Sequence, residues 1–523
     1  DKAFADWLAD ADVPKALHDA KGPMLAFGAR GWELRGVTSD TALSAYLAMP
    51  DQRSYDLADL ALRYLRRELR AEDDGGGQLS FDGQDEVAAA AADVVRARAV
   101  LELAERLDTE LEAKQASRLL REVELPLVGV LAVIERTGVA VDHDHLAGLE
   151  AQFGAAVKSA ADDAYAVLGR EINLGSPKQL QVVLFDEFGM PKTKRTKTGY
   201  TTDAEALTEL FAKTEHPFLE ALLRHRDATR LKITVDGLLK TVADDGRIHT
   251  TYNQIIASTG RLSSQDPNLQ NIPIRTEEGR RIRQAFVVGD GYESLLTADY
   301  SQIEMRIMAH LSEDAGLIEA FHSGEDLHAF TASRVFGVAP ADVSIAQRAK
   351  IKAMSYGLAY GLSAYGLSRQ LGIGTDEAKG LMDEYFLRFG GVRDYLRDVV
   401  DEARRSGFTE TILGRRRYLP DLTSDNRQRR EMAERMALNA PIQGSAADII
   451  KVAMLGVDRA LGESGLGSRV LLQVHDELVL EVAPGERDEL ETLVRREMGS
   501  AYDLAVPLDV SVGVGRTWHD ASH

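Results

Sequence analysis

The alternation of apolar and polar positions changes several times along the 523-residue chain. Residues 87–240 and 311–440 combine Ala- and Leu-rich runs with regularly interspersed charges, a pattern that predicts helices. Residues 247–253, 469–482 and 506–514 instead alternate between apolar and polar side chains, which indicates β-strands. The sequence therefore predicts helical blocks around a sheet whose strands lie far apart along the chain, an α+β arrangement.

Two apolar runs lead to an aspartate. Residues 294–298 precede Asp299, and residues 470–474 precede His475 and Asp476, which we expect near the tip of a β-hairpin. Strands hold carboxylates rigidly, and two such carboxylates can bind two Mg²⁺ ions about 3.5–4 Å apart for phosphoryl transfer. An ordinary acidic hairpin tip is the alternative interpretation of the second run, so the pairing of the two aspartates is a hypothesis.

A stripe with a four-residue spacing runs along one predicted helix. It contains Arg348, Lys352, Tyr356 and Tyr360, which share a slowly drifting face. The rise from Arg348 to Tyr356 is about 12 Å, enough for a nucleoside triphosphate to lie along the helix. Gly357 is unfavourable inside a helix, which a close approach of a ligand would explain. A basic amphipathic surface helix would account for the cations but not for the two aromatic residues.

Composition narrows the class of protein. The chain has no Cys, which excludes disulfides and thiolate metal sites and suits a reducing cytosol. No apolar run approaches the 18 or more residues of a membrane span. No signal peptide is visible and the chain opens on Asp1, so we expect a cytoplasmic, nucleoid-associated protein and a fragment of a longer chain.

The net charge of −21 argues against a protein that coats nucleic acid non-specifically. Basic residues nevertheless form four clusters around the acidic runs. Each cluster alone fits a solvated loop, whereas all four together could line a channel. The clusters are Lys192, Lys194, Arg195 and Lys197; Arg280, Arg281 and Arg283; Arg415, Arg416 and Arg417; and Arg427, Arg429 and Arg430.

In combination, these runs resemble DNA polymerase family A, the DNA polymerase I family, from about Glu124 to the C-terminus. Each segment alone is moderately specific, and all of them in this order are very specific. The matching segments are residues 258–264, 266–273, 299–304 (motif A), 348–361 (motif B), 435–444 and 474–478 (motif C). The resemblance implies a right-hand polymerase fold with palm, fingers and thumb.

The resemblance also implies a division into domains. The first block would be a truncated, vestigial α/β domain like the family's 3′–5′ exonuclease, and the family's 5′-nuclease domain would precede it, as in a Klenow-like large fragment. The expected domains are the exonuclease-like block at 1–120, a thumb at 121–245, palm at 246–312, fingers at 313–434 and palm again at 435–523.

Residue roles follow from the resemblance. Asp299 and Asp476, with the Tyr300 carbonyl, would coordinate two Mg²⁺ ions, with Mn²⁺ as a possible substitute, and Glu477 would support them. Lys352 would also donate a proton to pyrophosphate. Glu304 would be a steric gate against a ribose 2′-OH, and Tyr356 would favour acceptance of dideoxynucleotides. The nucleotide site would comprise Gln302, Glu304, His328, Arg348, Lys352, Tyr356 and Tyr360.

A second set of residues would contact primer–template DNA. Arg261 and Gln443 would hydrogen-bond minor-groove acceptors common to correct base pairs. Arg435 and Asn439 would support primer and template. The full set is Arg261, Asn268, Gln270, Arg435, Asn439, Gln443 and His475.

Proofreading residues are missing from the N-terminal block. The family's Asn-x-x-x-Asp motif corresponds to Asp19 through Pro23, and its Tyr-x-x-x-Asp motif to an Ala-rich run near 87–92. Asp108 and Glu110 mimic another exonuclease motif but lie in a helical stretch. We therefore expect no exonuclease activity and a block that supports thumb and palm.

Three further segments have simpler interpretations. Residues 142–145 (Asp-His-Asp-His) fit a helix start better than a metal site. The basic loop at 192–197 would contact the duplex backbone or remain a disordered, solvated loop. Residues 72–77 are acidic and Gly-rich and predict a flexible loop.

The leading prediction is a monomeric, template-directed DNA polymerase that adds dNTPs to a primer 3′-OH by a two-metal mechanism. It would act in DNA repair and replication gap filling without proofreading. A catalytically silent scaffold that binds primer–template is one alternative, and a related single-subunit RNA polymerase is another. A nuclease is the weakest candidate because the carboxylates of the exonuclease motifs are missing.

Overall fold

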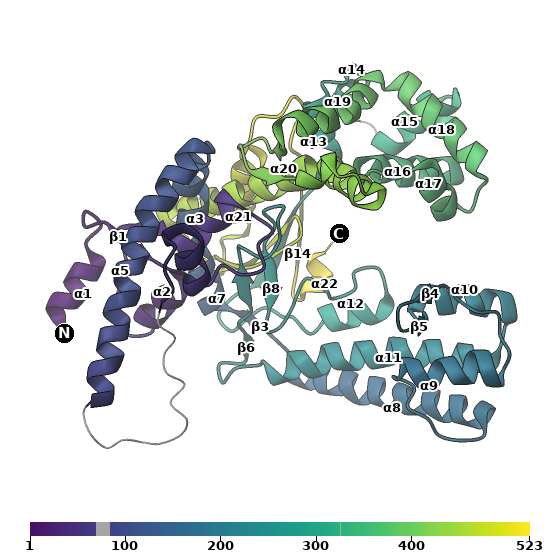
Figure 1. Cartoon of the computed structure of the whole chain (residues 1–523), viewed down its shortest axis with the longest axis horizontal. Helices are drawn as coiled ribbons and strands as arrows, with labels where there is room; N and C mark the ends of the chain where they lie inside the picture. Colours follow the sequence, from purple (N-terminus) through teal and green to yellow (C-terminus); the bar gives the residue numbers. More distant parts are fainter. Residues whose placement is uncertain (70–83, 325, 523) are drawn as a thin grey trace.

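The computed structural model describes residues 1–69, 84–324 and 326–522 (Figure 1). The predicted flexible loop at 72–77 lies outside the described residues. None of the described helices is both long enough and apolar enough to cross a membrane.

A four-stranded antiparallel sheet lies at the centre of the molecule, and it joins the two remote runs that end in aspartates. Leu296 and Ala298 of its third strand pack into one hydrophobic core, and Leu295 packs into another on the opposite face. The strand order is β12 (Arg469–Val474), β13 (Glu477–Val482), β9 (Ser294–Tyr300) and β14 (Val510–Gly515). The expected strand at 506–514 thus begins four residues later, after Pro507, which has no N–H for a ladder.

One large core cluster joins the sheet to the helices of the expected fingers. Between α13 and α20 the structure also has the short pair β10 (Phe408–Glu410) and β11 (Arg416–Tyr418). The expected boundary at 434/435 falls inside one long helix, α20. The helices are α13 (Ile303–Ser312), α14 (Ala315–His322), α15 (Leu327–Phe336), α16 (Ile345–Ala359), α17 (Ala364–Leu371), α18 (Thr375–Arg388), α19 (Gly390–Ser406), α20 (Arg427–Ser464) and α21 (Arg487–Gly499).

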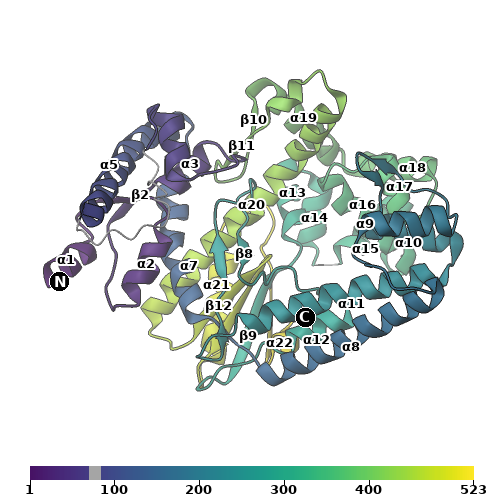
Figure 2. The ribbon, with the colours of Figure 1, turned by 60° about the horizontal axis from the view of Figure 1, so that its bottom comes forward.

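Two long helices that pack along each other form the body of the expected thumb. Its far end carries two shorter helices and a small hairpin in the basic loop. Arg369 of α17 donates to Glu209 of α10 at 2.6 Å, so the far end of the expected thumb contacts the expected fingers (Figure 2). The elements are α8 (His143–Leu168), α9 (Pro177–Gln181), β4 (Arg195–Thr196), β5 (Gly199–Tyr200), α10 (Ala204–Thr214) and α11 (Pro217–Lys240).

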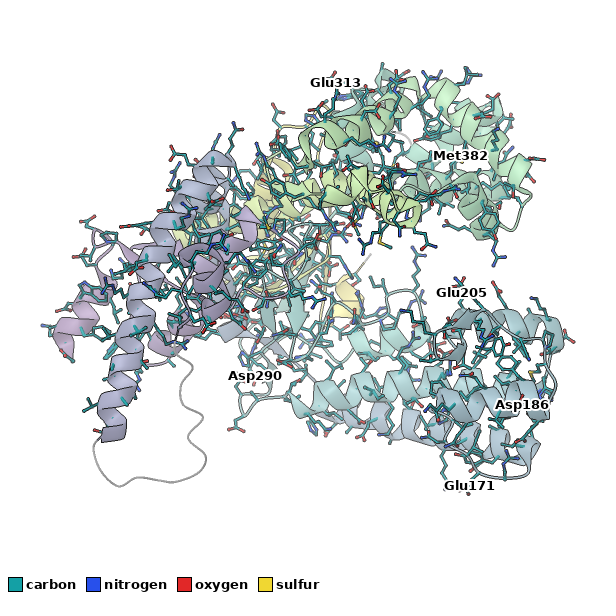
Figure 3. The ribbon with its side chains drawn as sticks, viewed as in Figure 1. Glu171, Asp186, Glu205, Asp290, Glu313 and Met382 are labelled. Atoms are coloured by element: carbon teal, nitrogen blue, oxygen red, sulfur yellow. The ribbon has the colours of Figure 1, made fainter. Side chains whose placement is uncertain are left out.

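In Figure 3, Glu205 lies on the side of α10 that faces α18, the helix that carries Met382. At the other end of the thumb, Asp142 caps the first turn of α8 by accepting from the backbone N–H of His145 at 3.0 Å. This contact confirms that residues 142–145 begin a helix.

The N-terminal block forms its own hydrophobic cluster beside the sheet domain. Its two short strands pair in parallel. The predicted helical stretch that begins at residue 87 is interrupted near Gln115, which has a φ of 58°. Its elements are α1 (Lys2–Ala9), β1 (Lys15–Leu17), α2 (Lys21–Gly28), β2 (Val37–Asp40), α3 (Thr41–Ala48), α4 (Leu57–Leu60), α5 (Gln84–Ala113) and α6 (Ser117–Leu119). Next come α7 (Leu125–Thr137), β3 (Val139–Ala140), β6 (Arg247–Ile248), β7 (Thr251–Asn253), β8 (Ser263–Gln265), α12 (Glu277–Arg283) and, at the C-terminus, α22 (Trp518–Ala521).

A fully buried ion network ties these parts together. Glu124 binds Arg415 at 2.6 Å and Lys451 at 2.8 Å, and Arg415 also binds Asp448 at 2.9 Å. Burial opposes ionisation of Glu124, but the charges of Lys451 and Arg415 outweigh it and lower the pKa of the carboxyl to about 2. Arg415 therefore cannot line a channel, contrary to the grouping of the basic clusters.

We predict that Glu124→Ala lowers the free energy of unfolding by ~3–5 kcal/mol, because it leaves buried Lys451 without the carboxylate that it binds and Arg415 with only one of its two carboxylates. Because the pKa is lowered, the stabilisation from Glu124 is complete above the ordinary pKa of 4.5 and disappears as the pH falls through about 2. Urea unfolding of the wild type and variant between pH 2 and 7 measures both effects. Glu122→Ala removes an exposed partner of Arg118 and is the matched control, with a change within about 0.5 kcal/mol.

Candidate active site

The two predicted aspartates lie at adjacent strand ends. Glu477 of β13 is the cross-strand partner of Asp299 in β9, and the backbone carbonyl of Asp476 accepts from the N–H of Tyr300 at 3.3 Å. His475, with a φ of 54°, and Asp476 form the two-residue turn between β12 and β13. The structure thus confirms the predicted hairpin and brings both motifs to the same end of the sheet.

The electrostatics of this end favour a bound cation. Burial, together with the charges of Glu477 and Asp476, raises the pKa of Asp299 to about 7. Burial also raises the pKa of Asp476 to about 6, although Arg261 acts in the opposite direction. A nearby cation would offset both burial and repulsion between these carboxylates, and would so stabilise their ionised forms.

The donor set fits a hard divalent cation such as Mg²⁺, which binds oxygen ligands. Among the described residues, no group of three or more His, Asp or Glu side chains is placed to hold a metal ion by itself. Asp299, Asp476 and the Tyr300 carbonyl would leave ligand positions open, which suits an ion that shares its ligands with substrate phosphates. The Tyr300 hydroxyl points away and donates to the Met498 carbonyl at 2.7 Å.

Glu477 is oriented by a residue that the sequence did not indicate. The indole N–H of Trp518 donates to Glu477 Oε1 at 2.8 Å, and the Arg283 guanidinium lies over the Trp518 ring, 4.3 Å from its centre. Both residues are buried, so Arg283 does not line a channel. A lone aromatic residue after the last strand carries no signal of its partner, which explains why it was missed.

The predicted phosphate-binding stripe lies on α16. A capping box of Ser344 and Gln347 starts this helix one turn before Arg348. Lys352 is exposed one turn further along, and the ring of Tyr356 lies 6.1 Å from that of His328 between centres. Burial and the charge of Arg348 lower the pKa of His328 to about 4, so its imidazole is neutral near pH 7.

A hydrogen-bonded set joins α16 to the carboxylate end of the sheet. Glu304, at the start of α13, accepts from the Tyr360 hydroxyl at 2.5 Å and from Arg261 at 2.9 Å. Burial and the charges of Glu304 and Asp476 raise the pKa of Tyr356. Helix α16 and the carboxylates therefore belong to one site. Gln302, with a φ of 52°, is the N-cap residue of α13.

Gly357 has a different role from the expected one. A Cβ atom on Gly357 would lie 2.7 Å from Leu362 Cδ2, so the close approach is to a side chain of the same protein. Leu362 therefore accounts for this glycine without a ligand. After α16 the chain turns back, and the Leu362 N–H donates to the Gly357 carbonyl at 2.8 Å. This turn requires a residue without a side chain at position 357.

The predicted DNA-contacting residues come from three elements. Arg435, Asn439 and Gln443 follow one another on α20. Arg435 is exposed, and the Asn439 Oδ1 is buried with no hydrogen-bond partner among the residues that the structure describes. Gln270 donates to the Leu262 carbonyl at 3.1 Å, and its backbone N–H donates to Asn268 at 3.0 Å. Burial, and then the charges of Arg261 and Arg283, lower the pKa of His475.

Comparison with known proteins decides the family. The family model described as DNA polymerase family A matches residues 143–520. The chain belongs to DNA polymerase family A. A second model, for the ribonuclease H-like domain of DNA polymerase I, matches residues 1–74. These matches confirm the polymerase fold and the exonuclease-like N-terminal block that the resemblance implied.

Several family A relatives are similar over the whole chain. DNA polymerase I of Mycobacterium tuberculosis (strain ATCC 25618 / H37Rv) is 66% identical over 525 residues, covering 100% of this chain and 58% of that protein. DNA polymerase I of Geobacillus stearothermophilus is 44% identical, covering 100% and 60%. The solved POL domain of Pol1 from M. smegmatis, in complex with DNA primer-template and dNTP, has a TM-score of 0.93 and 64% identity, covering 100% of this chain and 89% of that one. The chain thus spans about 58% of the length of its M. tuberculosis relative.

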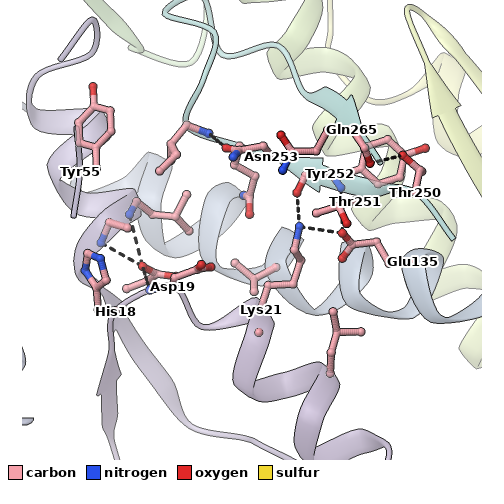
Figure 4. A pocket seen from close by; sticks show the side chains of 18 of the residues that line it. His18, Asp19, Lys21, Tyr55, Glu135, Thr250, Thr251, Tyr252, Asn253 and Gln265 are labelled. Carbon is pink, nitrogen blue, oxygen red and sulfur yellow. Dashed lines mark hydrogen bonds and ion pairs between the residues drawn. The ribbon is translucent and has the colours of Figure 1, made fainter. Parts of the chain in front are cut away.

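A cavity of about 800 Å³ lies elsewhere, between the N-terminal block and the region of β7 (Figure 4). His18, Asp19 and Tyr55 line one side of it. On the other side Lys21 binds Glu135 at 3.0 Å. The Asp299 and Asp476 carboxylates do not line this cavity. It belongs to the contact between the N-terminal block and the segment around β7.

We predict that Asp299→Asn weakens Mn²⁺ binding about tenfold or more, because it removes a charged ligand of the site. Electron paramagnetic resonance of free Mn²⁺ measures this without reference to activity. Asp290→Asn changes an exposed aspartate just before the same strand and should leave the affinity unchanged. Equal affinity of the two variants would remove Asp299 from the metal site.

Proposed function

We propose that this chain is a template-directed DNA polymerase that adds dNTPs to a primer 3′-OH by two-metal-ion nucleotidyl transfer. The observation that carries the proposal is that Asp299 of β9 and Asp476 of the adjoining β12–β13 turn lie at one end of the sheet, next to Glu304, which accepts from Tyr360 at the end of the charged helix α16. The proposal also includes a monomer that acts in DNA repair and replication gap filling, with a 5′-nuclease domain upstream in the full-length protein.

Asp299, Asp476 and the Tyr300 carbonyl would hold two Mg²⁺ ions, or Mn²⁺ in their place. Bound there, the ions would make the primer hydroxyl more acidic and neutralise charge on the triphosphate. Glu477 would stay beside the site, held by Trp518. Its role would be to add negative charge next to the ligands without occupying a ligand position.

The triphosphate would lie along α16. Arg348 suits the phosphates because a guanidinium can make two parallel hydrogen bonds to one group. Neutral His328 would donate one hydrogen bond, and Lys352 would donate a proton to the leaving pyrophosphate. Tyr356 would pack on the sugar and base, and Tyr360 would lie near the new base pair.

Selection of the correct nucleotide would depend on Glu304. Its two hydrogen bonds, to Arg261 and Tyr360, hold its carboxylate at the start of α13, where it would block a ribose 2′-OH. Gln302 would line the same site. Arg261 would release or share this bond when it contacts the minor groove. The DNA contacts would be made by Arg261, Asn268, Gln270, Arg435, Asn439, Gln443 and His475.

The proposal includes a lack of 3′–5′ proofreading. Excision of nucleotides needs a carboxylate cluster for metal ions. Asp108 is exposed on the long helix α5. The segment that corresponds to the family's Asn-x-x-x-Asp motif, Asp19 through Pro23, has no aspartate at its last position. These observations support a structural role for this block.

Primer extension tests the proposal directly. With Mg²⁺ and the four dNTPs, we expect extension of a 5′-labelled primer on a longer template, and without dNTPs an intact primer. Asp476→Asn is expected to abolish extension while DNA binding persists. Failure of the wild type to extend would favour a silent scaffold, efficient use of rNTPs would favour an RNA polymerase, and a shortened primer would refute the loss of proofreading.

A separate prediction concerns chain terminators. Burial and nearby carboxylates raise the pKa of Tyr356, so its hydroxyl stays protonated and can replace the hydrogen bond lost with a 3′-OH. Tyr356→Phe should raise discrimination against dideoxynucleotides about three- to tenfold, the value of one hydrogen bond. Competition between dNTP and ddNTP measures the ratio. Tyr365→Phe, on the exposed side of α17, is the control and should leave it unchanged.

A further inference from the structure

Asp326 connects the two elements that carry the residues proposed to bind the triphosphate. Its Oδ1 caps α15 by accepting from the backbone N–H groups of His328 at 2.9 Å and Ala329 at 3.1 Å. Its Oδ2 accepts from Arg348 of α16, at 2.9 Å from Nε and 2.7 Å from Nη2. One carboxylate thus fixes the helix start that positions His328 and the guanidinium of Arg348.

The geometry leaves part of Arg348 available. Nε and Nη2 both point to a single oxygen of Asp326, whereas Nη1 makes no contact with this carboxylate. The Arg348 side chain is 42% exposed. A guanidinium has five N–H donors, so Arg348 can bind a second anion while Asp326 holds it.

We propose that Asp326 is a positioning residue for the phosphate end of the incoming nucleoside triphosphate, acting through Arg348. This inference rests on the proposed function. A long arginine side chain that is free in solution loses rotamer freedom when it binds phosphate. The pair with Asp326 removes much of that freedom before the nucleotide arrives, and α15 brings His328 to the same place.

If Asp326 and the triphosphate competed for Arg348, Asp326 would weaken nucleotide binding. This competition is the smaller of the two effects. The ion pair is between half-exposed groups, and such pairs are weak because water and salt screen them. A triphosphate carries several negative charges and offers bidentate acceptors, so it exceeds a single carboxylate as a partner for the remaining donors.

The Asp326→Asn variant removes the negative charge of this residue and keeps the oxygen that caps α15. Asn is as good an N-cap as Asp, so α15 should remain intact. In single-nucleotide incorporation we expect KM for dNTP to rise about two- to fivefold, the range that a half-exposed ion pair can supply, with kcat changed less than about twofold. Asp326→Ser keeps a capping oxygen and removes the charge, and it should give the same result. Asp142→Asn changes another N-cap aspartate, at α8, and should leave KM unchanged.

A double variant tests whether the effect passes through Arg348. If it does, Asp326→Asn adds nothing to the KM of Arg348→Ala, whereas a general structural defect would add its own increase. An unchanged or lower KM in Asp326→Asn would overturn the proposal, as would a rise in only one of the Asn and Ser variants. If Arg348→Ala itself leaves KM unchanged, the proposed role of α16 fails instead. A raised KM in Arg348→Ala but not in Asp326→Asn would refute only the role of Asp326.

Discussion

Repulsion between carboxylates in a poorly hydrated place is the constraint on which the rest of this structure depends. Asp299, Asp476 and Glu477 lie at adjoining strand ends, and burial raises the pKa of the first two. Flexible segments would move such groups apart. Here the backbone of the sheet and the hydrogen bond from Trp518 hold them in place, so the fold keeps an arrangement that is unfavourable without a positive counter-charge.

The surroundings of the carboxylates are held by a second, buried set of charges. A Cβ atom on Gly260 would lie 2.5 Å from Arg415 Nε, so the loop that carries Arg261 rests directly on the network of Glu124, Arg415 and Asp448. Arg261 then contacts Glu304, which contacts Tyr360 at the end of α16. A continuous chain of contacts thus connects Glu124, at the start of α7, with the end of α16.

The features that could be predicted from the sequence are those set by local pattern. Apolar alternation that leads to Asp299 and to Asp476 predicted the strands and hairpin, and a four-residue spacing predicted the helix with Arg348. The partners of buried charges could not be predicted, because Glu124 and Arg415 lie 291 positions apart and nothing local distinguishes Arg415 from its exposed neighbours. Trp518 and Asp326 were missed for the same reason, since each acts through a contact that only the folded chain creates.

The ladder between β9 and its neighbours has an unbroken register on both edges, whereas the β12–β13 ladder shifts between Val470 and Leu472. A residue gained or lost in β9 before Asp299 would turn this side chain to the opposite face of the sheet. A substitution in β9 therefore leaves the direction of the Asp299 side chain unchanged, whereas a change in the length of β9 reverses it. The irregularity in β12 is the place where the palm can absorb a change in length without moving an aspartate.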